Sequence, residues 1–167
     1  MWATLEYLAE IGPALVVDVG GRDGIGTLWA WWMLGTDVIG VVPTEPTPDD
    51  SFTAGVPASV RVIVGDRRDR DTHLRTRDQC GGRPVDVLVL AGATTEEECR
   101  ADFAAYAPMV RDGGVVLLYG IADPGSPGVG AFWSGLDGPD LRELVGAHDP
   151  VGYGLVGIHG RDREQHG

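Results

Sequence analysis

The chain has 167 residues, of which 43% are hydrophobic, and a formal net charge of −12 at pH 7. This length suits one domain with a substantial core, so we expect a single domain over residues 1–160 and a frayed tail over 161–167. The acidic balance argues against nucleic acid and anionic membrane surfaces as partners, because both are negatively charged, and it favours small molecules or proteins.

The residue inventory narrows the chemistry further. All 13 basic residues are arginines, which excludes a Schiff-base or P-loop lysine. The two cysteines, Cys80 and Cys99, are too few for a disulfide framework and do not have the spacing of a zinc site. The N-terminus has no signal-peptide pattern, and no apolar run reaches about 18 residues. We therefore expect a cytoplasmic protein.

Short apolar runs rich in β-branched residues predict strands. They lie at residues 14–20, 37–42, 60–66, 85–91 and 114–120. Each run is apolar on both faces, which is typical of parallel strands covered on both sides by helices.

The segments between these runs have helical character at residues 25–35, 70–79 and 95–109. In the last of them Thr95 can cap the helix, and three glutamates follow where the helix dipole favours acids. The proline-rich stretch 41–57 predicts a surface loop. The mixed-sign run 66–78 predicts a solvated helix.

Two further short runs, 141–148 and 153–160, follow a glycine-rich segment and predict an antiparallel pair at one edge of the sheet. Alternating strands and helices imply right-handed crossovers. The expected fold class is therefore α/β, with a doubly wound, mostly parallel sheet and an antiparallel C-terminal strand pair.

The first predicted strand runs into the glycine-rich stretch VVDVGGRDGIGT at residues 16–27. In an α/β sheet the first strand-to-helix turn lies at the ligand-binding edge, and glycines there let the backbone approach a ligand closely. The spacing fits a nucleotide-type cofactor. A tight turn without a ligand is the alternative, because such turns also recruit glycine.

The order of these segments over residues 13–159 resembles the class I S-adenosylmethionine-dependent methyltransferases. Within that class it is similar to the small-molecule O-methyltransferases grouped with macrocin and cephalosporin-cluster enzymes. The most specific part is residues 85–120, where an acidic-start helix, the stretch PMVRDGG and a further strand follow in the order of that family. The resemblance implies a Rossmann-like methyltransferase fold and S-adenosylmethionine or S-adenosylhomocysteine as the cofactor.

The resemblance also implies cofactor-binding residues. Those around the methionine portion would be Asp18, which would help to hold the amino group, and Gly20, Gly21 and Gly24. Asp66 would lie near the adenine and accept a hydrogen bond from its amine, with Arg67 beside it, although Asp66 could instead be a turn residue. The acid that usually holds the ribose is replaced by Val42 and Pro43, so Glu45 is the nearest carboxylate.

The sequence departs from the family pattern where that family binds a divalent metal. Residues 90–94 read LAGAT instead of an IDGDH-like stretch, and Tyr119-Gly120 replaces a common HD pair. A hard cation needs several oxygen ligands, so we expect no catalytic metal.

Few side chains could act as a general base. Asp123 and Tyr119 are best placed by topology, at the end of the strand predicted at 114–120, although Asp123 could simply form a turn. His73 is a further catalytic candidate, with a solvated helix face as the alternative. Of the other histidines, His148 is expected in a turn and His166 in the tail, and His159 is a further candidate.

Family members commonly have N-terminal helices that cover the substrate, whereas only one short helix fits before the first strand here. We therefore expect an open cleft, or one closed by a second copy in a homodimer. The leading hypothesis is metal-free methyl transfer to a small-molecule, secondary-metabolite acceptor. The alternatives are a repurposed fold that catalyses a cyclisation, rearrangement or elimination, and a non-catalytic partner subunit, because fold alone does not decide function.

Overall fold

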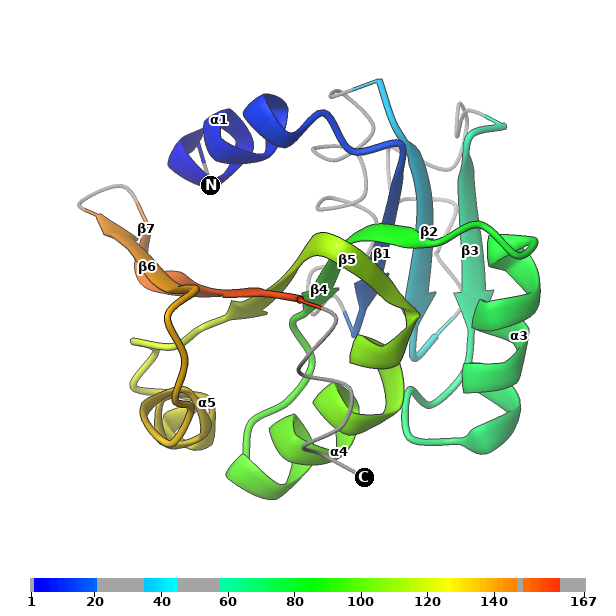
Figure 1. The fold of residues 1–167 in the computed structure, drawn as a ribbon. Helices are drawn as coiled ribbons and strands as arrows, with labels where there is room; N and C mark the ends of the chain where they lie inside the picture. The colour runs from blue at the N-terminus through cyan, green and yellow to red at the C-terminus, as the bar shows by residue number, and fades with distance from the viewer. Residues whose placement is uncertain (1, 21–34, 45–57, 147–148, 160–167) are drawn as a thin grey trace, which may run out of the picture.

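The computed structural model describes residues 2–20, 35–44, 58–146 and 149–159. Within these ranges a seven-stranded sheet forms the centre of the molecule (Figure 1). Its strands are β1 (Leu15–Val19), β2 (Asp37–Val42), β3 (Val60–Val64), β4 (Val85–Leu90), β5 (Val110–Tyr119), β6 (Leu141–Gly146) and β7 (Asp149–Gly157). The helices are α1 (Trp2–Ile11), α3 (Arg70–Cys80), α4 (Glu96–Tyr106), which continues into the 3-10 turn η2 (Ala107–Met109), and α5 (Pro127–Ser134).

The strand order is β3-β2-β1-β4-β5-β7-β6. Strands β1 to β5 are parallel, and β7 pairs antiparallel with both β5 and β6. This confirms the predicted doubly wound sheet and its antiparallel C-terminal pair. The strand order reverses between β1 and β4, which is the position where open α/β sheets bind ligands.

Two apolar layers cover the two faces of the sheet. Alternate residues of β1 point to opposite faces, so Val17 packs in one layer and Val16 in the other. The first layer includes residues of α3, α4 and α5, such as Cys99 and Phe132. The second includes Leu8 of α1, which is fully buried. The central strands are therefore covered on both sides, as their uninterrupted apolar sequences predicted.

Two element boundaries differ from the sequence prediction. Strand β5 begins at Val110 rather than at residue 114, because it contains a bulge: the step from Val85 to Val87 of β4 is matched by Val110 to Val115 of β5, which includes Gly113 with a φ of +74°. The helix predicted over 95–109 ends at Tyr106, and Pro108 lies in the 3-10 turn that follows. Helix α3 matches its prediction and ends at Gly81 in the left-handed conformation.

Several expectations lie outside the described residues. They concern the helix at 25–35, most of the loop at 41–57, the tail at 161–167, and His148 and His166. Within the part of the chain that is described, no helix is long and apolar enough to cross a membrane.

Candidate functional site

A cleft of about 550 Å³ opens at the carboxyl ends of the parallel strands. Segments that follow all five of these strands contribute to its wall. The described lining residues are Gly20, Val41, Pro43, Gly65, Asp66, Arg67, Arg68, Ala91, Gly92, Ala93, Thr94, Tyr119, Gly120, Asp123 and Ser126. This position, beside the point where the strand order reverses, is the usual ligand site of the architecture.

The loops after β1 and β4 touch inside this cleft at two glycines. A Cβ atom built on Gly20 would lie 2.7 Å from the Cα of Gly92, and one built on Gly92 would lie 2.9 Å from the Cα of Gly20. Gly20 also has a φ of +78°, which disfavours any side chain. The cleft therefore has a backbone wall at this point, and any larger residue would push the two loops apart.

Asp18 lies on β1, two residues before Gly20, and only 1% of its surface is exposed. Its backbone pairs with Gly40 of β2 and Val89 of β4, so it stands in the middle of the parallel strands. The structure places this carboxylate inside the protein, close in sequence to the glycine wall. The predicted cofactor residues Gly21, Gly24 and Glu45 lie outside the described residues.

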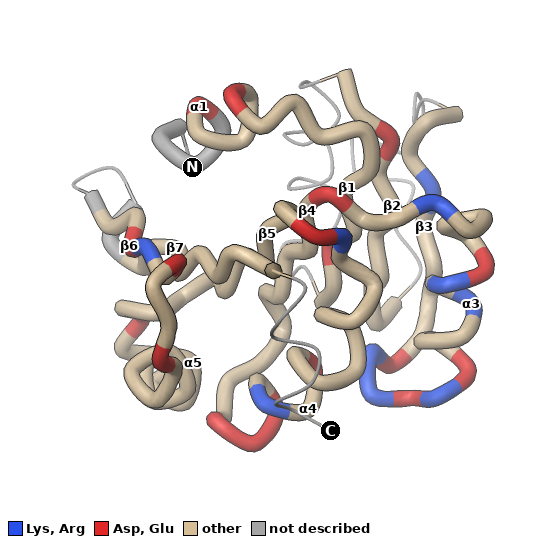
Figure 2. The backbone as a smooth tube through the Cα atoms, in the orientation of Figure 1, with Lys and Arg blue, Asp and Glu red and all other residues tan. Residues whose placement is uncertain are grey.

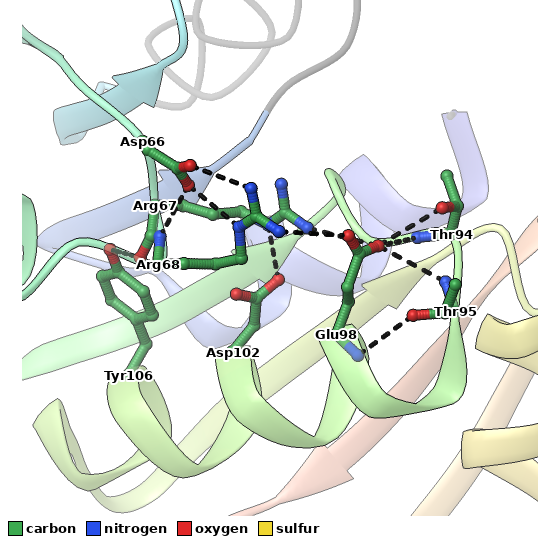
Figure 3. A network of polar contacts seen from close by, with 8 residues as sticks. All are labelled: Asp66, Arg67, Arg68, Thr94, Thr95, Glu98, Asp102 and Tyr106. Atoms are coloured by element: carbon green, nitrogen blue, oxygen red, sulfur yellow. Dashed lines mark hydrogen bonds and ion pairs between the residues drawn. The ribbon is translucent and has the colours of Figure 1, made fainter.

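Asp66 and Arg68 form an ion pair in the loop after β3 (Figure 3), and Nη1 of Arg68 also lies 3.7 Å from Glu98 Oε1. The Asp66 carboxylate accepts hydrogen bonds from the backbone N–H of Arg68 at 2.9 Å, from its Nε at 3.1 Å and from its Nη2 at 2.9 Å. Hydrogen bonds from the Arg68 side chain and backbone lower the pKa of Asp66 to about 2. Asp66 is thus a turn residue that stays ionised, and a ligand amine would have to share its carboxylate with Arg68.

Arg67 turns the other way, into the protein. Its Nε donates to Asp102 Oδ2 at 2.7 Å, and its Nη2 lies 3.5 Å from Glu98 Oε2. Only 15% of the Arg67 side chain is exposed, compared with 55% for Arg68. The prediction of a solvated helix over 66–78 is therefore wrong for its first residues, because α3 begins only at Arg70 and Arg67 is held against α4.

Glu98 connects this network to the start of α4. The Thr95 side chain and Glu98 form a capping box, and Glu98 Oε2 also accepts from the N–H of Thr94 at 2.9 Å. Hydrogen bonds from the backbone of Thr94 and Thr95 lower the pKa of Glu98, against the smaller opposing effect of burial. The loop from β4 to α4 is thus fixed by a charged side chain of the helix that follows it.

The charges around this part of the cleft largely cancel. Figure 2 shows acidic and basic residues alternating in the segment that leads into α3, with further acids at the start of α4. Burial raises the pKa of Asp102, and the hydrogen bond from Arg67 opposes that rise. The two arginines of the lining are each paired with carboxylates, which leaves little net positive charge for an anionic ligand.

The opposite rim of the cleft contains the two predicted base candidates from the segment at the end of β5. Tyr119 packs against Tyr153 of β7, with ring centroids 5.0 Å apart. Asp123 accepts a hydrogen bond at its Oδ1 from the N–H of Gly125 at 2.8 Å, so it forms the turn that was the alternative reading. It also lines the cleft, so the two roles are compatible.

The described histidines lie away from the lining. His73 packs edge-on against Tyr106 at 5.0 Å, and its Nε2 is buried without a hydrogen bond to the described residues. It is therefore partly covered by α4 rather than solvated. His159 pairs with Asp140 at 3.0 Å, next to the end of β7.

The part of the chain that the structure describes contains no group of three or more His, Cys, Asp or Glu side chains that could hold a metal ion. In the lining after β4, Ala91, Gly92 and Ala93 offer no side-chain ligand, and the Thr94 hydroxyl donates to Glu98 at 3.2 Å.

Sequence reasoning missed the network that joins Arg67, Glu98 and Asp102. Glu98 was explained by the helix dipole alone, and Asp102 was not singled out. One signal was available, because Asp102 lies one helical turn after Glu98 on a face that also contains Tyr106, and an acid on such a face needs a partner when buried.

No family model matches the sequence, and no curated protein matches it by sequence similarity. Solved structures do match its fold. MycE, a methyltransferase from the mycinamycin biosynthetic pathway solved with Mg, SAH and mycinamycin VI, is 19% identical with a TM-score of 0.65 over 97% of this chain and 50% of its own. This chain therefore spans about half the length of MycE.

Two shorter proteins match over more of their length. TomG, an O-methyltransferase from Streptomyces achromogenes involved in tomaymycin synthesis and solved with SAM, is 21% identical with a TM-score of 0.65 over 94% of this chain and 78% of its own. CalS11, a TDP-rhamnose 3'-O-methyltransferase of calicheamicin biosynthesis, is 16% identical with a TM-score of 0.65 over 92% and 75%. At these identities the likeness establishes a shared Rossmann-like methyltransferase fold.

Proposed function

We propose that this protein is an S-adenosylmethionine-dependent methyltransferase-like enzyme that acts on a small-molecule acceptor of secondary metabolism without a metal. The observation that carries the proposal is the cleft at the carboxyl ends of the strands, with its wall of touching glycines. Proteins of the same fold solved with SAM or SAH, and acting in biosynthetic pathways, support it. The order of sequence motifs supports the macrocin and cephalosporin-cluster group in particular.

The residues present fit such a cofactor. A cleft of about 550 Å³ is within the usual size of small-molecule sites, and a Cβ on Gly20 or Gly92 would close its backbone wall. We assign the methionine portion of S-adenosylmethionine or S-adenosylhomocysteine to Asp18, Gly20, Gly21 and Gly24. Asp66, Arg67 and Glu45 complete the predicted cofactor set.

The cofactor would supply a methyl group on a sulfonium, and the protein has to orient the acceptor and remove its proton. We assign the removal of this proton to Asp123 or Tyr119, which both line the cleft. The hydrogen bond from Gly125 engages Oδ1 of Asp123, and the described residues donate no hydrogen bond to its Oδ2. His73 is a weaker candidate than these two, because it packs against Tyr106 and is not among the lining residues.

A different reaction on the same fold is the second candidate. The specific observation in its favour is that Pro43 lines the cleft after β2, and Ala91 and Ala93 line it after β4, where the family resemblance implies acids. With those acids replaced, a cyclisation, rearrangement or elimination could use the shape of the cleft, or the chain could serve as a non-catalytic partner subunit. A homodimer that covers the cleft fits either reaction.

Calorimetric titration with S-adenosylmethionine and with S-adenosylhomocysteine tests the proposal. We expect saturable binding of both at one site per chain. The absence of binding at millimolar cofactor would eliminate methyl transfer and leave the repurposed fold or the partner subunit. Co-purification with a larger homologous subunit would favour the latter.

A further inference from the structure

Arg67 contacts the loops that follow two other strands. Its Cδ lies 3.2 Å from a Cβ built on Gly20 and 3.3 Å from one built on Gly92. Arg67 itself belongs to the loop after β3. Its aliphatic stem therefore lies beside the point where the loops after β1 and β4 touch, and its position limits how far those loops can move.

The charged end of Arg67 is held by helix α4. Asp102, whose side chain is 3% exposed, accepts from Nε at 2.7 Å, and Glu98 lies 3.5 Å from Nη2. The hydrogen bond from Nε to Asp102, with the Glu98 carboxylate nearby, restrains the direction of the guanidinium, while Nη2 is buried without a hydrogen bond to the described residues. The charge of Arg67 is already neutralised by these carboxylates, so its contribution to the cleft is positional rather than electrostatic.

The main chain of Arg67 is restrained as well. The Tyr106 hydroxyl donates to the Arg67 carbonyl oxygen at 2.8 Å. Glu98, which faces the guanidinium, also accepts from the N–H groups of Thr94 at 2.9 Å and Thr95 at 3.4 Å. Figure 3 shows these contacts as one connected group between the loop after β3 and the start of α4. The end of the Gly92 loop that leads into α4 is thereby tied to Glu98 of that helix.

We propose that Arg67 is a positioning residue of the cleft, which keeps Gly20 and Gly92 in contact by joining their loops to Asp102 and Glu98. The identity of the ligand rests on the proposed function, whereas the effect on the loops does not. Loss of the guanidinium should loosen residues 91–95 and, through that loop, weaken cofactor binding.

The test compares the full-length protein with the double variant Arg67→Met/Asp102→Leu. Methionine keeps most of the aliphatic stem, and removal of Asp102 at the same time avoids an unpaired carboxylate in the interior. Hydrogen exchange read by mass spectrometry follows residues 91–95, and calorimetry gives the Kd for S-adenosylmethionine. Circular dichroism and thermal unfolding report the global fold.

We expect faster exchange confined to residues 91–95 and a Kd raised by about tenfold, because small displacements in a binding site are costly. The matched control is Arg100→Met, which removes an arginine–carboxylate pair of the same helix, Arg100 to Glu96 at 2.8 Å. The Arg100 side chain is 67% exposed and it does not line the cleft, so exchange at 91–95 and the Kd should stay unchanged.

Unchanged exchange and affinity in the double variant would overturn the proposal, as would equal effects in the Arg100 control. If the double variant does not fold, Arg67→Lys tests the proposal instead. A lysine ammonium can pair with Asp102, but it lacks the second arm by which the guanidinium also approaches Glu98. Its exchange rate at residues 91–95 and its Kd for S-adenosylmethionine should both lie between the wild-type values and those expected for the double variant. Wild-type values in both measurements would overturn the proposal. If the wild type binds no cofactor, the proposed function fails while the exchange measurement still decides the role of Arg67.

Discussion

Gly20 and Gly92 meet back to back, with a Cβ built on Gly20 only 2.7 Å from the Cα of Gly92. The two residues come from loops after β1 and β4, which are neighbours in the sheet although 72 positions separate them in the chain. Because the contact is between backbones, it forms a wall of the cleft that no side chain can replace.

Substitution of either glycine should therefore impair the cleft. We expect Gly92→Ala and Gly20→Ala to abolish detectable S-adenosylmethionine binding and to lower stability by about 1–3 kcal/mol, because the new Cβ overlaps the facing backbone at both positions and Gly20 also has a positive φ. Calorimetry and thermal unfolding measure the two effects. The control is Gly138→Ala, since a Cβ there meets no atom within 4 Å. Wild-type affinity in Gly20→Ala would show that the cofactor site lies elsewhere.

Asp123→Asn separates the two roles of this residue. The asparagine oxygen can still accept the hydrogen bond from Gly125 that forms the turn, but its amide cannot take a proton. If Asp123 is the base, kcat should fall by about 100-fold at an unchanged Kd for S-adenosylmethionine. Tyr119→Phe tests the other candidate in the same assay, and the exposed Asp137→Asn serves as the control. Full activity of both test variants would remove these residues from the proton transfer.

Removal of divalent metal should leave the activity intact. We expect the same kcat after treatment with a chelator and after addition of Mg²⁺, because the lining after β4 is Ala91, Gly92, Ala93 and Thr94 rather than a set of carboxylates. Activity lost to the chelator and restored by magnesium would contradict metal-free chemistry.

Asp86 stabilises the amino end of the sheet. Its Oδ2 accepts from the N–H groups of Ala14 at 2.8 Å and Leu15 at 2.9 Å, and its Oδ1 accepts from Arg111. Burial alone would raise the pKa of Asp86, but these hydrogen bonds outweigh it and lower the pKa below the ordinary 3.8. The resulting stabilisation is present above pH 3.8 and is lost as pH falls through the lower folded-state pKa.

Asp86→Asn should therefore lower the free energy of unfolding at pH 7 by about 1–3 kcal/mol. The difference from wild type should shrink in acid, as the wild-type carboxylate becomes protonated. Urea unfolding of the wild type and the variant at pH 7 and at pH 3 measures this difference at each pH. A difference that is the same at the two pH values would show that the ionised carboxylate is not the stabilising form.

Cys99 should be unreactive in the native state. It is 3% exposed on α4, and burial raises the pKa of its thiol to about 11, so almost no thiolate is present at neutral pH. We expect iodoacetamide at pH 8 to label it only in the unfolded protein. Ser134→Cys at the exposed end of α5 provides a reactive control. Labelling of native Cys99 at the rate of that control would contradict its burial.

Patterns that depend on near neighbours determined most of the fold. Apolar β-branched runs predicted the strands, and Thr95 with the glutamates after it predicted the start of α4, which the capping box confirms. These signals need only residues a few positions apart, so they can be recognised in the sequence. The start of β5 was predicted four residues too late, because the glycines at 113 and 114 are not part of an apolar run but accommodate a bulge inside the strand.

The tertiary structure alone decided how the cleft is built. Arg67 reaches Asp102, 35 positions away, only because the loop after β3 lies beside α4 in the folded sheet. The contact of Gly20 with Gly92 likewise requires β1 and β4 to be paired in register. The local sequence shows that Gly20, Arg67 and Asp102 are present, but not which residues they contact. Those contacts depend on strand order and register, which are set by the packing of the whole chain.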